Sequence, residues 1–324
     1  MPTIANQITE VFTEKADQIV TSALALKGGE GEPSLISLVN WEDPTSPQGF
    51  EEEIEVSANA SAGTYAKGGN FPAAGRAEHV DQIIAWSRYV FVVEATGTQL
   101  AQLELAESLR MTKIKNFLMK QMRSGTEAVT DVMEGHLLTN TPSLNSDGFT
   151  GLEFIASPTN TYGGVNATTY GNTGCAVTTV GGALTMSAMD TLTNSFKSSK
   201  QGKYNVVLTS YGQRQKYEDL TAGTGSVPAG QSITSTQLDG TDRVFSAGFT
   251  SHFYRNRPVV ALQDYATDAM DFLDSRNLKG TVLQDWETKV FHPEADRVRW
   301  VVKAQLAVML QNRGKALTRL DGLT

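Results

Sequence analysis

The sequence predicts an α+β fold, with helices and strands largely in separate stretches of the chain. Residues 97–139 carry apolar side chains at helical spacing, residues 186–220 alternate helix, strand and helix, and the last 75 or so residues are mostly strand-like runs. The chain has 324 residues, of which 40% are hydrophobic, enough to form a substantial core. Gly is frequent, at 29 residues, which suggests many turns on a folded scaffold.

Residues 1–50 are expected to form an arm. Apolar residues at spacings of three and four predict a helix over 3–27, and a short strand could form within 35–39. The arm carries apolar side chains, including Leu35 and Leu38, that it has little capacity to bury internally. We therefore expect these side chains to contact a neighbouring copy of the chain.

Residues 51–93 are predicted to form a long hairpin. The outgoing limb is 53–56 and the return limb is 79–93, both with strand-like patterns. The tip at 61–75 is rich in Gly and Ala. It is too long for a tight turn and has too few large apolar side chains to form a core of its own. It would be either a mobile lid or an arm lying over a partner. The candidate contact residues in this region are Tyr65, Lys67, Phe71 and Arg76.

The segment 94–144 is dominated by the helix predicted over 97–139. Its length of roughly 60 Å, at about 1.5 Å per residue, is large for a compact domain of this size. Ser124-Gly125 is a natural place for a kink or a break in this helix. Such a long spine is expected where a flat subunit must bridge a distance.

Residues 145–265 are predicted to form a mixed layer. Residues 145–185 are rich in loops, and a helix over 186–200 follows, with Thr185 as its cap. A buried strand at 204–209 then leads into a helix over 211–220.

Residues 266–324 are predicted to be mainly strands. The runs 287–291 and 298–310 flank the turn 292–296 and should form a hairpin. A final short strand is expected at 315–320.

The order of these elements, together with four stretches, resembles a known family. The stretches are 204–210, the run from Gly248 through Arg257-Pro258-Val259-Val260, the segment 272–278, and the ending 298–323 with Asn312-Arg313. They resemble the major capsid proteins of tailed bacteriophages, which have the Hong Kong 97 (HK97)-like fold. The resemblance covers nearly the whole chain, and its specificity comes from the order and spacing of motifs that are individually weak.

The resemblance implies a domain organisation. Residues 1–50 would be the N-terminal arm, 51–93 the extended β-hairpin (E-loop), and 94–144 the spine helix of a peripheral domain. Residues 145–265 would be the axial domain, and 266–324 would return to the peripheral domain as β-strands.

The implied function is structural. As a major capsid protein, the chain would assemble with itself into pentamers and hexamers of an icosahedral shell around double-stranded DNA. The alternative is an encapsulin-like shell protein of a bacterial nanocompartment, which shares the fold but encloses protein cargo. The localisation implied is the virion, after assembly in the host cytoplasm.

Further partners follow from the resemblance. Many family members begin with a scaffolding segment that a protease removes, but only about fifty residues precede the hairpin here. Either a separate scaffolding protein serves or the chain is the processed form, and Met1 favours a separate scaffolding protein. A portal is a further expected partner, and a decoration protein is a possible one. Some family members crosslink a tip lysine to an asparagine of a neighbour. Lys67 with Asn277 or Asn312 would be the candidates here, but we favour a solvated Lys67 without a crosslink.

Composition and motifs argue against other classes of function. The net charge is −8, a poor match for a protein that reads DNA sequence, so packaged DNA would be held without sequence-specific contacts. No apolar run reaches the ~18 residues that a membrane-spanning helix needs. The single cysteine, Cys175, excludes an internal disulfide.

No catalytic or cofactor-binding motif is present in the sequence, so we expect neither an enzyme nor a cofactor. The glycine loops that bind nucleotides, the nucleophile elbow and the zinc motif His-Glu-x-x-His are all missing. The four histidines do not have metal-ligand spacing. Acidic residues recur near position 270 and could suggest a cation site, although we favour a solvated acidic edge. They are Asp264, Asp268, Asp271 and Asp274.

Overall fold

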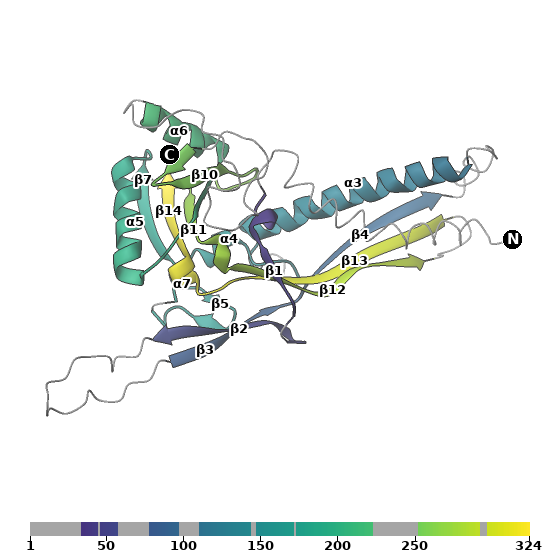
Figure 1. The fold of residues 1–324 in the computed structure, drawn as a ribbon, viewed down its shortest axis with the longest axis horizontal. Helices are drawn as coiled ribbons and strands as arrows, with labels where there is room; N and C mark the ends of the chain where they lie inside the picture. Colours follow the sequence, from purple (N-terminus) through teal and green to yellow (C-terminus); the bar gives the residue numbers. More distant parts are fainter. Residues whose placement is uncertain are drawn as a thin grey trace.

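The computed structural model describes residues 34–44, 46–57, 78–96, 110–143, 147–171, 173–222, 252–291 and 297–324. Two sheets organise the chain, and a two-stranded hairpin projects away from them (Figure 1). The predicted helix over 3–27, the hairpin tip at 61–75 and the turn 292–296 lie outside the described residues.

The first sheet has four strands and carries the long helix. Its strands, in spatial order, are β1 (Asn40–Glu42), β12 (Leu278–Phe291), β13 (Arg297–Leu310) and β4 (Ser87–Thr96). β12 and β13 pair antiparallel from Leu278↔Leu310 to Phe291↔Arg299, which confirms the predicted hairpin. In β4 the side chains of Tyr89, Phe91 and Val93 are buried, as expected for a strand with one covered face.

The long helix α3 (Arg110–Thr139) packs against that covered face and lies beside β4 (Figure 1). The predicted break at Ser124-Gly125 is wrong, because the helix runs through both residues. Gly125 has a packing role instead, since a Cβ atom there would lie 2.5 Å from Cδ2 of Phe91. The glycine therefore lets the helix approach β4 closely. Residues 97–109, the predicted first part of this helix, are outside the described residues.

The predicted hairpin is confirmed near its base. β2 (Gly49–Ser57) and β3 (Glu78–Ala85) pair antiparallel, from Gly49↔Ala85 to Ser57↔Glu78. The return limb is not one strand, however. It is interrupted at Trp86, whose indole Nε1 donates a hydrogen bond to the Pro47 carbonyl at 3.0 Å, and the chain then enters β4 of the four-stranded sheet.

The second sheet has six strands. In spatial order they are β7 (Ala176–Gly182), β14 (Leu317–Leu323), β11 (Met270–Leu273), β8 (Val206–Thr209), β10 (Arg257–Ala261) and β9 (His252–Tyr254). Helices α5 (Met186–Lys200) and α6 (Tyr211–Ala222) cover one face through apolar contacts (Figure 1). The other face joins the core of the four-stranded sheet, so the two sheets share one apolar core. β11 is consequently buried along its whole length.

Several predicted elements of this part are confirmed. α5 has the predicted bounds, and the Thr185 hydroxyl accepts a hydrogen bond from Ala188 N at 3.2 Å as the cap. β8 and α6 are also present, although β8 begins two residues later and α6 ends two residues later than predicted. The loop-rich reading of 145–185 overlooked β7, which is an edge strand of the sheet. The same region holds α4 (Leu152–Ile155) and the small hairpin β5 (Thr161–Tyr162) and β6 (Val165–Asn166).

The sheets do not follow the predicted division at residues 265 and 266. β11 and β14 both come from the segment 266–324, yet they lie in the same sheet as β8 and β10. Within the segment 266–324 the chain passes between the sheets twice, once at η3 (Ser275–Asn277) and once at α7 (Arg313–Ala316). A cut at residue 265 would divide the six-stranded sheet. In the described part of the chain, no helix is long and apolar enough to cross a membrane.

Candidate functional site

Two of the predicted contact residues belong to the chain's own core. Leu35 is 0% exposed and Leu38 is 6% exposed, so the expectation that only a neighbouring copy could cover them is wrong. The expected strand at 35–39 is also wrong, because a 3-10 turn, η1 (Ile36–Leu38), takes its place and β1 begins only at Asn40.

The physical reason is a side chain on the long helix. Glu134 of α3 accepts hydrogen bonds from Ser34 Oγ at 2.8 Å, from Ile36 N at 3.1 Å and from Leu35 N. The Glu134 carboxylate thus fixes the start of η1 beside α3. The apolar side chains of η1 then pack in the same core as those of α3. The sequence contains no local signal for this contact, since about a hundred residues separate the partners.

The other four candidates, Tyr65, Lys67, Phe71 and Arg76, lie outside the described residues. The structure does describe the base of their hairpin, and contacts with other parts of the same chain hold it in place. Glu52 of β2 accepts hydrogen bonds from Lys279 Nζ and from Gln311 Nε2, both at 2.7 Å. Burial lowers the pKa of Lys279, but Glu52 and Glu42 outweigh it and the net shift is upward.

Asn277 and Asn312, the candidate partners for a crosslink that we did not favour, both lie where the chain passes between the sheets. The Asn277 carbonyl accepts a hydrogen bond from Gln311 N at 2.9 Å. Asn312 has φ 47°, a left-handed conformation that asparagine tolerates better than most residues. Both residues therefore shape the turns at this junction.

The four acidic residues near 270 do not form one solvated edge. Asp264 and Asp268 are exposed, but the other two are buried. Asp271 is 0% exposed and pairs with Arg319, and Asp274 is 3% exposed and pairs with Arg276. Among the described residues, no group of three or more potential ligands is placed to hold a metal ion.

One face of the four-stranded sheet is open and partly apolar. Val90 and Val92 of β4 are 56% and 55% exposed, on the side of the sheet away from α3. Their cross-strand partners are Lys303 and Val301 of β13. Ion pairs flank this stripe, namely Arg299 with Glu94 at 2.6 Å and Lys303 with Glu287 at 3.7 Å. We call Val90, Val92 and Val301 the open valine stripe.

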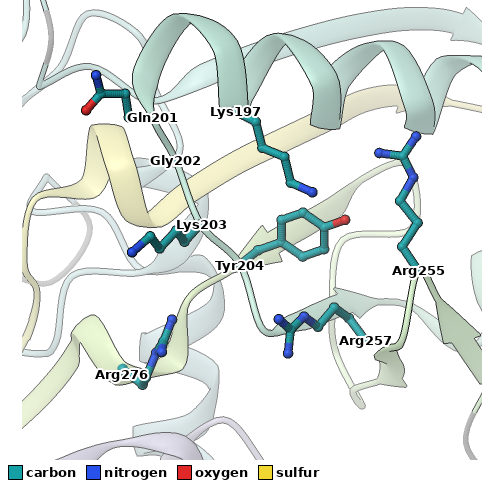
Figure 2. A pocket seen from close by; sticks show the side chains of 8 residues that line it. All are labelled: Lys197, Gln201, Gly202, Lys203, Tyr204, Arg255, Arg257 and Arg276. Atoms are coloured by element: carbon teal, nitrogen blue, oxygen red, sulfur yellow. The ribbon is translucent and has the colours of Figure 1, made fainter. Parts of the chain in front are cut away.

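A second surface feature is a basic pocket of about 330 Å³ beside the six-stranded sheet (Figure 2). The end of α5, the loop before β8, the turn between β9 and β10, the first residue of β10, and η3 all contribute to it. Its lining includes five cationic side chains: Lys197, Lys203, Arg255, Arg257 and Arg276.

Tyr204 lies among these cations. The Lys197 ammonium is 5.6 Å from the centre of the Tyr204 ring. Burial raises the pKa of Tyr204, and the positive charges of Arg255 and Arg257 oppose that shift. We did not predict this pocket from the sequence. The triplet Arg255-Asn256-Arg257 and the lysines around 200 are the signals that could have suggested it.

No family model matches the sequence, and no curated protein matches it. The fold, in contrast, is similar to solved shell structures. The capsid asymmetric unit of cyanophage A-1(L) matches with a TM-score of 0.72 and 13% identity, over 90% of this chain and 92% of that one. The capsid of a native GTA particle matches with a TM-score of 0.57 and 12% identity, over 90% of each chain.

An encapsulin from Synechococcus elongatus also matches, with a TM-score of 0.51 and 14% identity, over 89% of this chain and 86% of that one. The chain therefore has the HK97-like capsid fold that the sequence predicted.

Proposed function

We propose that this chain is the major capsid protein of a tailed bacteriophage, a subunit that assembles with copies of itself into a closed icosahedral shell. The observation that carries the proposal is the likeness to a cyanophage capsid subunit, with a TM-score of 0.72 over nine tenths of both chains. Because fold alone does not fix function, the surfaces of this chain must also suit assembly.

The shape of the subunit supports this role. A β-hairpin projects beyond the body, and a long sheet backed by α3 extends to one side (Figure 1). The open valine stripe leaves apolar side chains on that sheet uncovered. Closed symmetric assemblies bury such surfaces between copies, and association then stabilises each subunit by mass action.

The remaining partners belong to the same proposal. Pentamers and hexamers of the chain would form the shell, with a separate scaffolding protein during assembly, a portal, and a decoration protein on the finished particle. The shell would enclose double-stranded DNA without reading its sequence. It would be assembled in the host cytoplasm and then be part of the virion.

A second candidate function is the shell of an encapsulin-like nanocompartment. The similarity to an encapsulin favours it, although the TM-score of 0.51 is lower than that for the cyanophage capsid. The contents of particles isolated from the native source discriminate between the two. Double-stranded DNA supports the capsid, and a cargo protein without DNA supports the compartment.

Assembly is tested by electron microscopy of the purified full-length chain, with any scaffolding protein supplied. We expect closed shells for the natural chain. Deletion of Ala62–Gly75, the predicted hairpin tip, should leave a folded subunit with an unchanged circular dichroism spectrum but no shells. A natural chain that stays monomeric at high concentration would refute the proposal, whereas shells from the deleted chain would show that the tip is not the organising contact.

We expect the open valine stripe to lie against a neighbouring copy. The double variant Val90→Glu with Val92→Glu should retain its thermal midpoint within a few degrees, because both side chains already face solvent. It should nevertheless form few or no shells, since two buried unpaired carboxylates would oppose the contact. Sedimentation velocity and electron microscopy measure both outcomes.

Val132→Glu is the matched control, because Val132 is an exposed valine on α3, 49% exposed. Normal shell formation by the double variant would show that the stripe is not an intersubunit contact.

A further inference from the structure

The C-terminal end of α3 is fastened to a segment that follows it, residues 147–151, which we call the entry segment. Phe149 of this segment is held at both of its backbone groups. Its N–H donates a hydrogen bond to the Tyr89 hydroxyl of β4 at 3.0 Å, and its carbonyl accepts one from Asn140 Nδ2 at 2.7 Å. The Tyr89 hydroxyl also lies 3.0 Å from Nδ1 of His136 on α3. The helix, the strand and the entry segment thus meet in one hydrogen-bond network.

This network determines which form of His136 the fold needs. The Tyr89 oxygen accepts the bond from Phe149, and the hydroxyl has a single hydrogen to donate. Every group is paired when that hydrogen is donated to His136 Nδ1, which requires a neutral imidazole whose Nδ1 carries no proton. Burial raises the pKa of Tyr89, so the phenol keeps its hydrogen and His136 is the group that titrates.

The imidazole has little room to turn away from its partners. A Cβ atom at Gly148 would lie 2.5 Å from His136 Nδ1 and 3.2 Å from Asn140 Nδ2, so glycine lets the entry segment cross the ring closely. The segment is also fastened to β4, where Arg88 N donates a hydrogen bond to the Asp147 carbonyl at 2.9 Å. A change at the His136 ring must therefore be taken up by the entry segment.

Burial governs the titration of His136. The charged side chains on the elements packed around this network are Asp131 and Glu134 of α3, Arg88 of β4, Asp147 of the entry segment and Glu153 of α4. Carboxylates favour a protonated ring. Burial has the opposite effect and prevails, so the pKa of His136 lies below its ordinary value.

We propose that His136 is an acid-sensitive switch, which releases the entry segment from the end of α3 when its imidazole takes up a proton. A protonated Nδ1 cannot accept the Tyr89 hydrogen, and the hydroxyl is left in a buried site without that acceptor. The folded chain binds this proton less well than the unfolded chain does, so local stability is full at neutral pH and falls as the pH drops below about 6.5. The switch acts within one chain and goes beyond the proposed role in a shell.

Hydrogen exchange at Phe149 of the full-length chain, measured by NMR before assembly, tests the switch. Between about pH 7 and about pH 5, the protection of this amide should fall about tenfold or more, after correction for intrinsic exchange rates. Val207 in β8, a strand paired on both sides, should keep its protection. His136→Asn places an amide oxygen near the position of Nδ1 and carries no titrating proton, so Phe149 should stay equally protected at both pH values.

His79→Asn is the matched control, because His79 is an exposed histidine on β3. That variant should lose protection at Phe149 in acid as the natural chain does. Tyr89→Phe separates the effect of the hydrogen bond from that of burial. It removes the donor that favours the neutral ring, so the pKa of His136 in an NMR titration should rise toward its ordinary value.

Protection of Phe149 that is unchanged in acid, or that is lost equally in His136→Asn and the natural chain, would overturn the proposal. An equal loss at Val207 would also overturn it, because the whole chain would then unfold. So would a pKa of His136 that stays the same in Tyr89→Phe. None of these measurements depends on whether shells form.

Discussion

Replacing Asp271 with alanine should lower the free energy of unfolding by about 3–5 kcal/mol, because it leaves a buried arginine without its counter-charge. Asp271 lies in β11 and Arg319 lies directly opposite in β14. Arg319 Nε and Nη2 each donate a hydrogen bond of 2.8 Å to the carboxylate. Burial lowers the pKa of Arg319, and the charge of Asp271 outweighs that effect and raises it.

Chemical denaturation followed by tryptophan fluorescence measures this loss. Asp219→Ala on α6 is the matched control, since Asp219 is exposed and its loss should change stability by less than about 0.5 kcal/mol. The paired variant Asp271→Leu with Arg319→Met should recover most of the stability, because an apolar pair removes both charges together. A single variant as stable as the natural chain would mean that Arg319 finds another partner or water at no cost.

Replacing Arg313 with methionine should destabilise the chain by about 3 kcal/mol or more, because several buried carbonyls would lose a charged donor. Arg313 is 3% exposed and follows β13 at the start of α7. Its guanidinium donates to the carbonyls of Thr173 at 3.1 Å, Ile155 at 3.3 Å and Asn160. It also lies 5.6 Å from the ring centre of Tyr162.

Arg313 connects the junction of the two sheets to the loop region 155–173. The chain leaves the four-stranded sheet at Leu310 and enters the six-stranded sheet at Leu317, and Arg313 lies between these points. Burial lowers the pKa of Arg313, but an arginine stays protonated at neutral pH. Its loss should therefore loosen the joint between the sheets as well as the loop 155–173.

Arg313→Lys is the informative companion variant. An ammonium keeps the charge but cannot reach three carbonyls through a planar fork, so we expect most of the loss to remain. Arg88→Met, at an exposed arginine on β4, is the control for removing an arginine as such. Hydrogen exchange at Ile155 and Thr173 should rise in the Arg313 variants only. Unchanged exchange with full stability would show that water replaces the guanidinium.

Elements with a strong local pattern could be predicted from the sequence. The apolar spacing over 186–200 predicted the bounds of helix α5 correctly. Thr185 was also predicted correctly as the residue that caps this helix. The runs on either side of 292–296 gave the β12–β13 hairpin, and the order of elements along the chain gave the capsid fold. Helical and strand periods reflect which face of an element is buried, and that information is contained within a few neighbouring residues.

Features that depend on distant partners could not be predicted. Leu35 and Leu38 looked exposed because nothing near them in the sequence covers them, yet Glu134 holds their turn against the long helix. Asp271 looked like part of an acidic edge until β14 brought Arg319 opposite to it. The cations of the basic pocket come from five separate segments that only the folded chain brings together.

The sequence by itself thus determined the type and order of the elements, because each element shows its buried face through a local period. The tertiary structure decided which apolar side chains are buried, and which charged side chains are paired, within one chain. Burial and charge pairing depend on contacts between residues that lie far apart in the chain, 48 positions for Asp271 and Arg319 and 100 positions for Ser34 and Glu134.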